Sequence, residues 1–204
     1  MTEASTVHEA VDAIRRGQPI VLPSDTVYGL CADAYRNEPA ERVYRLKGRG
    51  RTQPTALLAI DVETLVECIP ELRGRWESIA RALLPGPLTL ILPNPARRFR
   101  WVTGENYDAI GVRVPALEGP AAEVLEQVGC VIATSANLAG GADPRWLDEV
   151  PKEILAGVAA TIDGGELPGT PSTVLDFTGD EPKVVREGAV PAAEALERAA
   201  AALA

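Results

Sequence analysis

Apolar residues recur along this chain with two different spacings, one typical of helices and the other typical of strands. Residues 7–16 place apolar side chains on one helical face, and Gly17 follows as a stop. Residues 19–23, a short apolar run that begins and ends with proline, predict a buried strand. By the same reasoning, further helices are expected over residues 39–47, 71–84, 119–128 and 192–203, and further strands over 55–60, 88–92, 110–114, 130–134, 158–162, 172–177 and 183–186. The two kinds of segment alternate, which predicts an α/β fold around a central sheet.

The spacing of the last strands indicates how the sheet is paired. Between 158–162, 172–177 and 183–186 the chain has no room for crossover helices, so some strands must pair antiparallel and the sheet is mixed. No internal repeat and no long linker rich in Pro, Gly or Ser divides the chain. The sequence therefore predicts one domain over residues 1–204, with a C-terminal helix over about 191–204.

Composition limits the available chemistry. The single histidine, His8, falls in the predicted first helix, so Ser-His and Cys-His nucleophiles and histidine zinc sites are not expected. The three cysteines, Cys31, Cys68 and Cys130, are widely spaced and odd in number, which favours reduced, mostly buried thiols over a disulfide framework or a zinc site. The chemistry must then depend on Lys, Arg, Ser, Thr, Asn and carboxylates.

Charge and hydropathy restrict the partners. A net charge of -9 disfavours a general nucleic-acid-coating surface but leaves room for a local basic cavity. The run 97–101, Arg-Arg-Phe-Arg-Trp, resembles a nucleic-acid patch, although its lack of helix or strand period favours a solvated loop. No apolar stretch is long enough to cross a bilayer, and residues 1–5 lack the start of a signal peptide. We expect a cytoplasmic protein without a membrane partner.

Two triplets combine polar groups in a way that suits a phosphorylated ligand. Lys47-Gly48-Arg49 places two cations at the end of the predicted helix 39–47. Ser135-Ala136-Asn137 presents a hydroxyl and an amide where the predicted buried strand 130–134 ends. Two cations facing a polar cluster at a strand end can hold phosphate. The alternative is a surface cation pair and an ordinary strand-ending turn.

Four other polar residues stand in loops or strands where they need an explanation. Arg113 lies in an apolar strand and needs a carboxylate or phosphate partner, which a structural ion pair within the chain would also supply. Arg186 ends the last predicted strand, where a solvated arginine is the alternative. Thr26 and Ser172 can also be plain turn formers that bond local backbone. Neither a Gly-x-x-x-x-Gly-Lys-Ser/Thr loop nor a Gly-x-Gly-x-x-Gly motif is present, so the common nucleotide-binding classes are excluded.

Six short motifs in a fixed order connect these residues. They are Pro-Ser-Asp-Thr-Val-Tyr-Gly-Leu at 23–30, Lys-Gly-Arg at 47–49, Pro-Gly-Pro-Leu-Thr at 85–89, Val-Arg-Val-Pro at 112–115, Ser-Ala-Asn at 135–137 and Ser-Thr-Val at 172–174. Taken together, they resemble the YrdC/TsaC family of threonylcarbamoyl-AMP synthases in its short, single-domain form, over about residues 7–188. No single motif is specific, whereas all of them in family order are very specific.

The resemblance implies a twisted, mixed α/β sheet with flanking helices and a deep open cavity. It implies that L-threonine, bicarbonate and ATP with Mg²⁺ give threonylcarbamoyl-AMP and pyrophosphate. The product would pass to a separate threonylcarbamoyl transferase that modifies an adenosine of tRNA, and a weak contact of this chain with tRNA stays open.

The resemblance also implies roles for individual residues. The expected catalytic residues, which would also bind ATP, are Lys47, Arg49, Ser135 and Asn137, joined by Arg186 at the triphosphate. The expected threonine-binding residues are Thr26, Tyr28, Arg113 and Ser172, with Arg113 on the threonine carboxylate and Tyr28 shaping the pocket. No metal ligand is expected from the protein.

Three departures from the family pattern, and two alternatives, accompany this interpretation. Gly50 replaces a usual Pro, which predicts a more mobile loop after Arg49; Ser24 replaces Thr, and Glu187 replaces Pro.

One alternative is a YrdC-like paralogue without synthase activity, in which the Lys-x-Arg and Ser-x-Asn groups are degraded; here both are intact. The other is an RNA-binding ribosome or tRNA factor, against which the acidic net charge and the scarcity of aromatic residues count.

Overall fold

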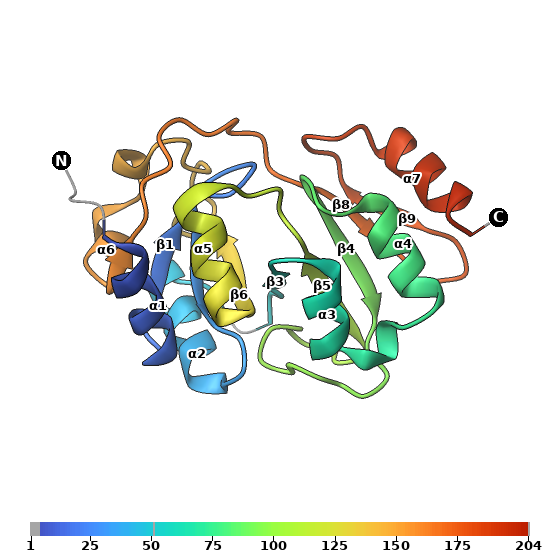
Figure 1. Ribbon diagram of the computed structural model, residues 1–204, viewed down its shortest axis with the longest axis horizontal. Helices are drawn as coiled ribbons and strands as arrows, with labels where there is room; N and C mark the ends of the chain where they lie inside the picture. Colours follow the sequence, from blue (N-terminus) through green and yellow to red (C-terminus); the bar gives the residue numbers. More distant parts are fainter. Residues whose placement is uncertain (1–4, 51, 204) are drawn as a thin grey trace.

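The computed structural model describes residues 5–50 and 52–203, and within them nine strands form one twisted, mixed sheet (Figure 1). The strands are β1 (Ile20–Leu22), β2 (Gly29–Asp33), β3 (Ala56–Ala59), β4 (Leu88–Pro93), β5 (Ala109–Arg113), β6 (Cys130–Ser135), β7 (Ala160–Thr161), β8 (Thr173–Asp176) and β9 (Lys183–Arg186). Their spatial order is β7-β1-β2-β6-β3-β5-β4-β8-β9. The pairs β1–β7, β3–β5 and β4–β8 are parallel and the others antiparallel, so the predicted mixed sheet is confirmed.

Helices flank this sheet. They are α1 (Val7–Arg15), α2 (Asn37–Lys47), α3 (Val62–Cys68), α4 (Arg75–Leu83), α5 (Gly119–Val128), α6 (Lys152–Leu155) and α7 (Ala192–Ala201), with short 3-10 turns at Pro70–Leu72 and Leu147–Glu149. The start of α1 shows how local sequence sets a boundary. The hydroxyl of Thr6 accepts from the Glu9 N–H, and the Glu9 carboxylate accepts from the Thr6 N–H in return, so two N–H groups at the helix start have partners.

The alternation of side chains along the strands divides the core between the two faces of the sheet. Leu57, Leu90 and Ile132 point to one face, where they pack with α2, α3, α4 and α7. Leu58 and Val131, each one residue away in its strand, point to the other face and pack with α1 and α5. These two helices lie over β1, β2 and β6 (Figure 1), so part of the second face stays open for a cavity.

Three expectations about the elements need correction. No strand was expected between residues 23 and 55, but Gly29 begins β2, whose apolar run is short and adjoins the polar motif. Helix α3 was not expected; Asp61 caps it by accepting from the Thr64 N–H. The helix expected over 71–84 begins only at Arg75, because Gly74 takes a φ of +85° and separates it from the preceding turn.

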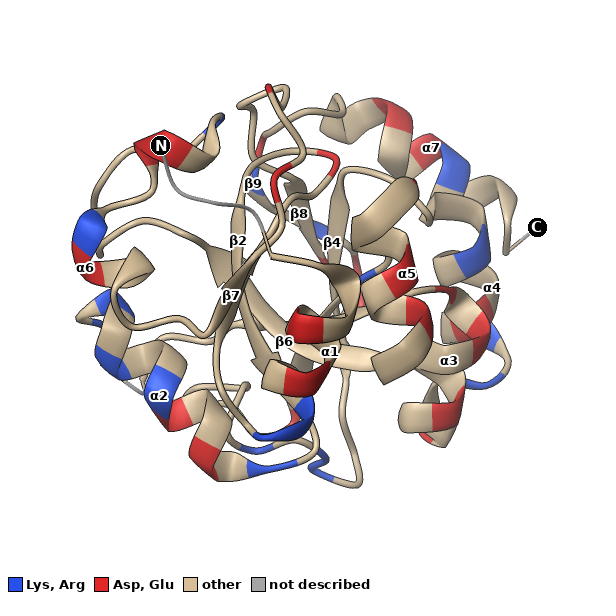
Figure 2. Cartoon of the chain, turned by 60° about the vertical axis from the view of Figure 1, so that its left-hand side comes forward, with Lys and Arg blue, Asp and Glu red and all other residues tan. Residues whose placement is uncertain are grey.

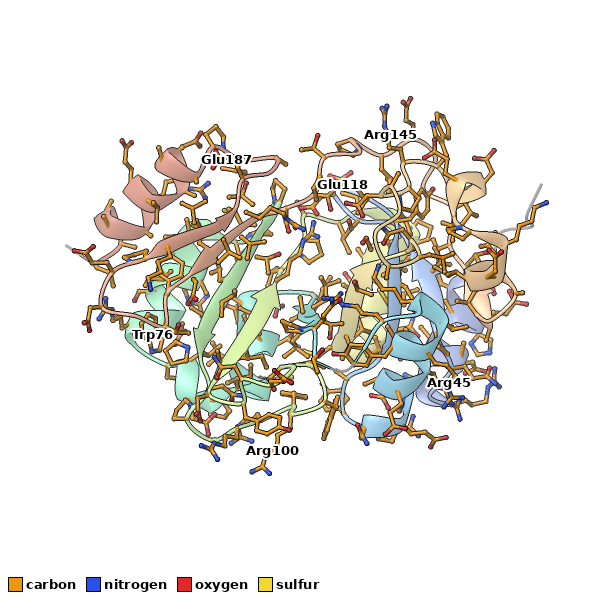
Figure 3. The ribbon with its side chains drawn as sticks, turned by 180° about the vertical axis from the view of Figure 1, so that it is seen from behind. Arg45, Trp76, Arg100, Glu118, Arg145 and Glu187 are labelled. Carbon is orange, nitrogen blue, oxygen red and sulfur yellow. The ribbon has the colours of Figure 1, made fainter. Side chains whose placement is uncertain are left out.

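The arginine-rich run 97–101 lies outside helices and strands, as expected for a solvated loop. Arg97 forms an ion pair with Asp108, and Arg98 forms one with Glu71. Arg100 points away from the body of the molecule (Figure 3). Two of the three arginines thus already have carboxylate partners.

The acidic residues are concentrated on the outer elements. Figure 2 shows Asp and Glu mainly along the helices and outer loops, while the strands are almost free of them. In the part of the chain that the structure describes, no helix has the length and apolar character needed to traverse a membrane.

Candidate active site

A cavity of about 900 Å³ opens on the uncovered face of the sheet. Seen from behind, α2 and β6 lie on one side of the middle and β4, β5 and β8 on the other, with side chains from both sides between them (Figure 3). Among the residues that the structure describes, its lining includes four cations, Lys47, Arg49, Arg113 and Arg186, but only two carboxylates, Asp143 and Asp176. This local excess of positive charge, in a chain of net charge -9, indicates an anionic ligand.

The Lys-Gly-Arg triplet reaches this cavity because of how α2 ends. Gly48 adopts the left-handed conformation, with φ +64° and ψ +31°, directly after the last helical residue. Glycine has no Cβ to oppose this conformation, so the chain turns sharply here. As a result Lys47 and Arg49 both line the cavity although only one residue separates them.

Lys47 is a buried cation among neutral oxygens, only 5% exposed. Its Nζ donates to the carbonyl oxygens of Ser135 at 2.7 Å and Asn137 at 3.0 Å, and also contacts the Ser135 hydroxyl and the Asn137 side-chain oxygen. Burial, and secondarily repulsion by Arg49, lower the pKa of Lys47 to about 8, an effect that Asp143 partly opposes. A buried ammonium held only by neutral oxygens is prepared to accept an anion.

This depressed pKa predicts a pH dependence. The protonated ammonium is the form that attracts phosphate, and it is lost as pH rises through about 8. For the substrates that the resemblance implies, we therefore expect kcat/KM for ATP, measured at saturating threonine, to fall above that pH. In the Lys47→Arg variant the cation persists, because arginine stays protonated, so the fall should vanish. A wild-type profile that stays flat through pH 8 would contradict this assignment.

Arg49 is incompletely paired. Nη2 donates to the Pro54 carbonyl oxygen at 2.8 Å and Nη1 to the Thr134 hydroxyl at 3.4 Å. Its buried Nε has no hydrogen-bond partner among the residues described. Because an unsatisfied buried donor is costly, this group is best explained by a ligand acceptor.

The Ser-Ala-Asn triplet forms a loop that folds around Lys47. The Ser135 hydroxyl donates to the Asn137 side-chain oxygen at 2.7 Å, and the Asn137 side-chain amide donates to the Gly141 carbonyl oxygen. The Ala139 N–H donates to the Lys47 carbonyl oxygen at 3.1 Å. The end of α2 and the end of β6 are therefore joined by hydrogen bonds. The sequence analysis expected the two cations to face the Ser-Ala-Asn cluster, and Lys47 does so.

Arg113 lies at the end of β5 and has a carboxylate partner from far away in the sequence. Its Nη2 donates to Asp25 and to the Thr26 hydroxyl, the latter at 2.8 Å. The second Asp25 oxygen accepts from the Ala116 N–H at 3.0 Å, which fixes the carboxylate. Arg113 Nε is buried and unpartnered in the described chain, so the guanidinium keeps a buried donor for a ligand. The structural ion pair and the ligand role are therefore compatible.

Ser172 and Arg186 meet on the opposite side of the cavity. Arg186 Nη2 donates to the Ser172 hydroxyl at 3.1 Å, and Nε donates to the Ser172 carbonyl oxygen at 3.0 Å. The hydroxyls of Ser172 and Thr89 lie 2.8 Å apart. All three residues line the cavity, and Arg186, although exposed to solvent, is held at the cavity wall by its bonds to Ser172.

Tyr28 is the one expected site residue that does not line the cavity. It is fully buried, and its hydroxyl lies 2.9 Å from both Asp163 Oδ1 and the Gly165 carbonyl oxygen while it accepts from the Gly164 N–H. Burial, more than the nearby Asp163, raises the pKa of Tyr28 to about 12, so the phenol stays neutral. We therefore assign Tyr28 a positioning role: its hydroxyl connects the turn at residues 163–165 to the chain segment that carries Thr26.

Removal of this hydroxyl tests the positioning role. Tyr28→Phe leaves the Gly164 N–H unpaired, and we expect a loss of about 1–3 kcal/mol in unfolding free energy. A direct substrate contact would instead raise the KM for one substrate without lowering stability. Urea unfolding combined with steady-state kinetics separates these outcomes.

Sequence reasoning left two residues of the site without a role. Asp25 and Thr89 lie inside recognised motifs, yet their partners, Arg113 and Ser172, are 88 and 83 residues away. The only sequence signal for the Asp25–Arg113 pair is that Asp25, a carboxylate, follows a predicted buried strand and so needs a cationic partner. Arg51, in the loop after Arg49 that was expected to be mobile, lies outside the described residues, so that expectation stays a prediction.

Together these features define a class: an α/β protein whose open cavity presents four cations and several hydroxyls to an anionic ligand. A sequence model of the Sua5/YciO/YrdC family, described as "Telomere recombination", matches residues 12–188. The chain thus belongs to the Sua5/YciO/YrdC family, which confirms the resemblance and the fold that it implied.

Individual relatives agree with this membership. A putative threonylcarbamoyl-AMP synthase of Mycobacterium tuberculosis is 33% identical over 89% of this chain and 83% of the relative. The crystal structure of Pyrococcus abyssi Sua5 complexed with L-threonine superposes with a TM-score of 0.85 and 33% identity, over 94% of this chain but only 56% of that one. Escherichia coli YciO gives a TM-score of 0.77 and 28% identity, over 93% of this chain and 92% of that one.

Proposed function

We propose that this protein is a threonylcarbamoyl-AMP synthase, which converts L-threonine, bicarbonate and ATP to threonylcarbamoyl-AMP and pyrophosphate. One observation carries the proposal: Lys47, a buried cation bound only by neutral oxygens, faces the same cavity as the unpartnered Nε of Arg49. The names of the relatives from Mycobacterium tuberculosis and Pyrococcus abyssi support the choice of reaction.

The reaction suits a site without histidine. Bicarbonate supplies CO₂ and hydroxide, and the threonine amine captures the CO₂ as a carbamate while its proton and the hydroxide form water. A carbamate oxygen then attacks the α-phosphorus of ATP while pyrophosphate leaves. Such a step depends on positioning and on charge stabilisation. In our proposal Lys47 and Arg49 stabilise the negative charge, and Ser135 and Asn137 orient the carbamate and adenylate. Arg186, at the far wall, binds the triphosphate.

Threonine is assigned to the part of the cavity near β5. Arg113 is held by Asp25 and Thr26 and keeps its Nε free for the substrate carboxylate. Thr26 and Ser172, both buried at the cavity wall, offer hydroxyls to the threonine amine and side chain. The solved complex of Pyrococcus abyssi Sua5 with L-threonine supports a threonine site on this fold.

Magnesium is proposed as part of the ATP substrate. Within residues 5–50 and 52–203, no group of three or more His, Cys, Asp or Glu side chains could hold a metal ion. Magnesium commonly binds through phosphate oxygens with one or two carboxylates. No step of the proposed reaction passes through a protein-bound metal. The further partners in this proposal are a threonylcarbamoyl transferase that acts on tRNA and, weakly, tRNA itself.

Pyrophosphate release tests the proposal against its alternatives. The purified protein with MgATP should release pyrophosphate only when L-threonine and bicarbonate are both present. Binding of ATP or threonine without release would support an inactive paralogue. RNA binding with steep salt dependence and no ATP turnover would support an RNA-binding factor.

A further inference from the structure

Two of the three cysteines lie side by side, away from the cavity. Cys68 is the last residue of α3, Cys130 is the first residue of β6, and their sulfur atoms are 3.1 Å apart. This separation is about 1 Å longer than a disulfide bond. Both thiols are free in the structure, and the third, Cys31, is buried in the other core cluster.

The fold holds this pair in place. Cys130 pairs with Ala59 at the end of β3, and α3 follows β3 after only two residues. Residues on either side of the pair, Ile69 and Val131, are fully buried. Packing thus holds both backbones so that the two sulfurs stay within about 1 Å of bonding distance.

The surroundings favour a reactive Cys68. The hydrogen bond from the Cys130 thiol, aided by the Tyr35 hydroxyl 3.4 Å away, lowers the pKa of Cys68 below that of an ordinary thiol, against the opposing effects of burial and Glu67. The same pairing, together with burial and the Asp61 charge, raises the pKa of Cys130. Cys68 is only half-buried, beside Tyr35, which is 51% exposed, so a small oxidant can reach it.

We infer that Cys68 and Cys130 are a modification site, at which hydrogen peroxide forms a reversible disulfide between α3 and β6. The Cys68 sulfur attacks peroxide, the O–O bond breaks, hydroxide leaves, and a sulfenic acid forms. The Cys130 sulfur then attacks the Cys68 sulfur, the S–O bond breaks, and water leaves with the Cys130 proton. Overall, two thiols lose two electrons and two protons, and one peroxide becomes two water molecules.

The bond would cross the middle of the sheet. Strand β6 lies next to β3 in the strand order, with β7, β1 and β2 on one side of this pair and β5, β4, β8 and β9 on the other. Ser135 lies in β6 itself, whereas Arg113 lies in β5 and Arg186 in β9, on the β3 side of the pair. A disulfide between positions 62 residues apart would thus add a covalent link between α3, which follows β3, and β6 at the middle of the sheet.

Thiol counting tests the inference on the full chain. The protein is reduced with a dithiol, treated with hydrogen peroxide, denatured, alkylated and weighed by mass spectrometry. We expect the three thiols of the wild type to fall to one, and peptide mapping to find Cys68 joined to Cys130. Cys31→Ala, the matched control, should fall from two thiols to none, whereas Cys68→Ser should keep two. Three persistent thiols, a sulfinic acid at Cys68, or a link between two chains would overturn the inference.

Thermal melting gives a second readout. A disulfide that closes so long a loop should raise Tm by about 5–10 °C relative to the reduced protein. The rise should disappear on dithiol treatment and be absent in Cys68→Ser. An oxidised wild type that carries the bond but melts no higher would overturn the stabilising role.

Discussion

Replacement of Lys47 by methionine should lower kcat by about 10²–10³-fold, the typical cost of removing one preorganised electrostatic group. Methionine keeps the unbranched side chain that packs at the end of α2 but removes the ammonium. The charge on the attacking carbamate and on the phosphate would then lose its nearest buried cation. Quenched-flow measurement of pyrophosphate release with saturating substrates gives kcat directly.

This variant is expected to fold, with a loss of about 1–3 kcal/mol in unfolding free energy because the carbonyl oxygens of Ser135 and Asn137 lose a donor. The methionine removes a buried charge whose contacts are all neutral oxygens, and the Asn137 side-chain oxygen keeps its bond from Ser135. Lys152→Met, at an exposed lysine that begins α6, is the matched control and should keep wild-type kinetics. If Lys47→Met kept normal turnover, the charge assignment would be wrong.

Replacement of Arg113 by lysine should raise the KM for threonine by about 10–100-fold and leave the KM for ATP near its wild-type value. Lysine preserves the charge beside Asp25, so no buried carboxylate is left unpaired. It cannot, however, donate both to Asp25 and to a substrate carboxylate with the fixed geometry of a guanidinium. Initial rates at varied threonine and saturating MgATP measure the effect.

A surface arginine provides the control for this change. Arg145 pairs with Glu166 at 2.7 Å, but both side chains are about half exposed. Arg145→Lys should therefore change neither KM, because an exposed ion pair contributes little. If the KM of the Arg113→Lys enzyme rose for ATP rather than for threonine, Arg113 would have to be assigned to nucleotide binding instead of threonine binding.

The sequence predicted those parts of the site that depend on local pattern. Lys47 could be placed because a helical period ends at Gly48, and Ser135 because an apolar run ends there. Strand β2 was missed because its few apolar residues follow a polar motif without a turn signal. The Asp25–Arg113 pair was not predicted, since only the sheet topology brings these distant residues together.

Tyr28 illustrates a different limit. The motif identified it as a threonine-binding residue that shapes the pocket, whereas in the structure it bonds to the Asp163 turn and does not line the cavity. Tyr28 lies between β1 and β2, and the direction of its side chain depends on how these two strands pair. That pairing cannot be read from the sequence of the motif. The side-chain direction of such a residue follows from the folded structure.

Product identification is the most direct test of the central claim. The protein is incubated with MgATP, L-threonine and isotope-labelled bicarbonate, and the nucleotide products are analysed at once by mass spectrometry. Our account predicts threonylcarbamoyl-AMP that carries the bicarbonate label. The Lys152→Met control should form this product as the wild type does, and neither protein should form it when a substrate is omitted. The Lys47→Met variant should form much less of it. AMP or ADP without a labelled adduct, from a folded wild-type protein that binds threonine, would contradict it.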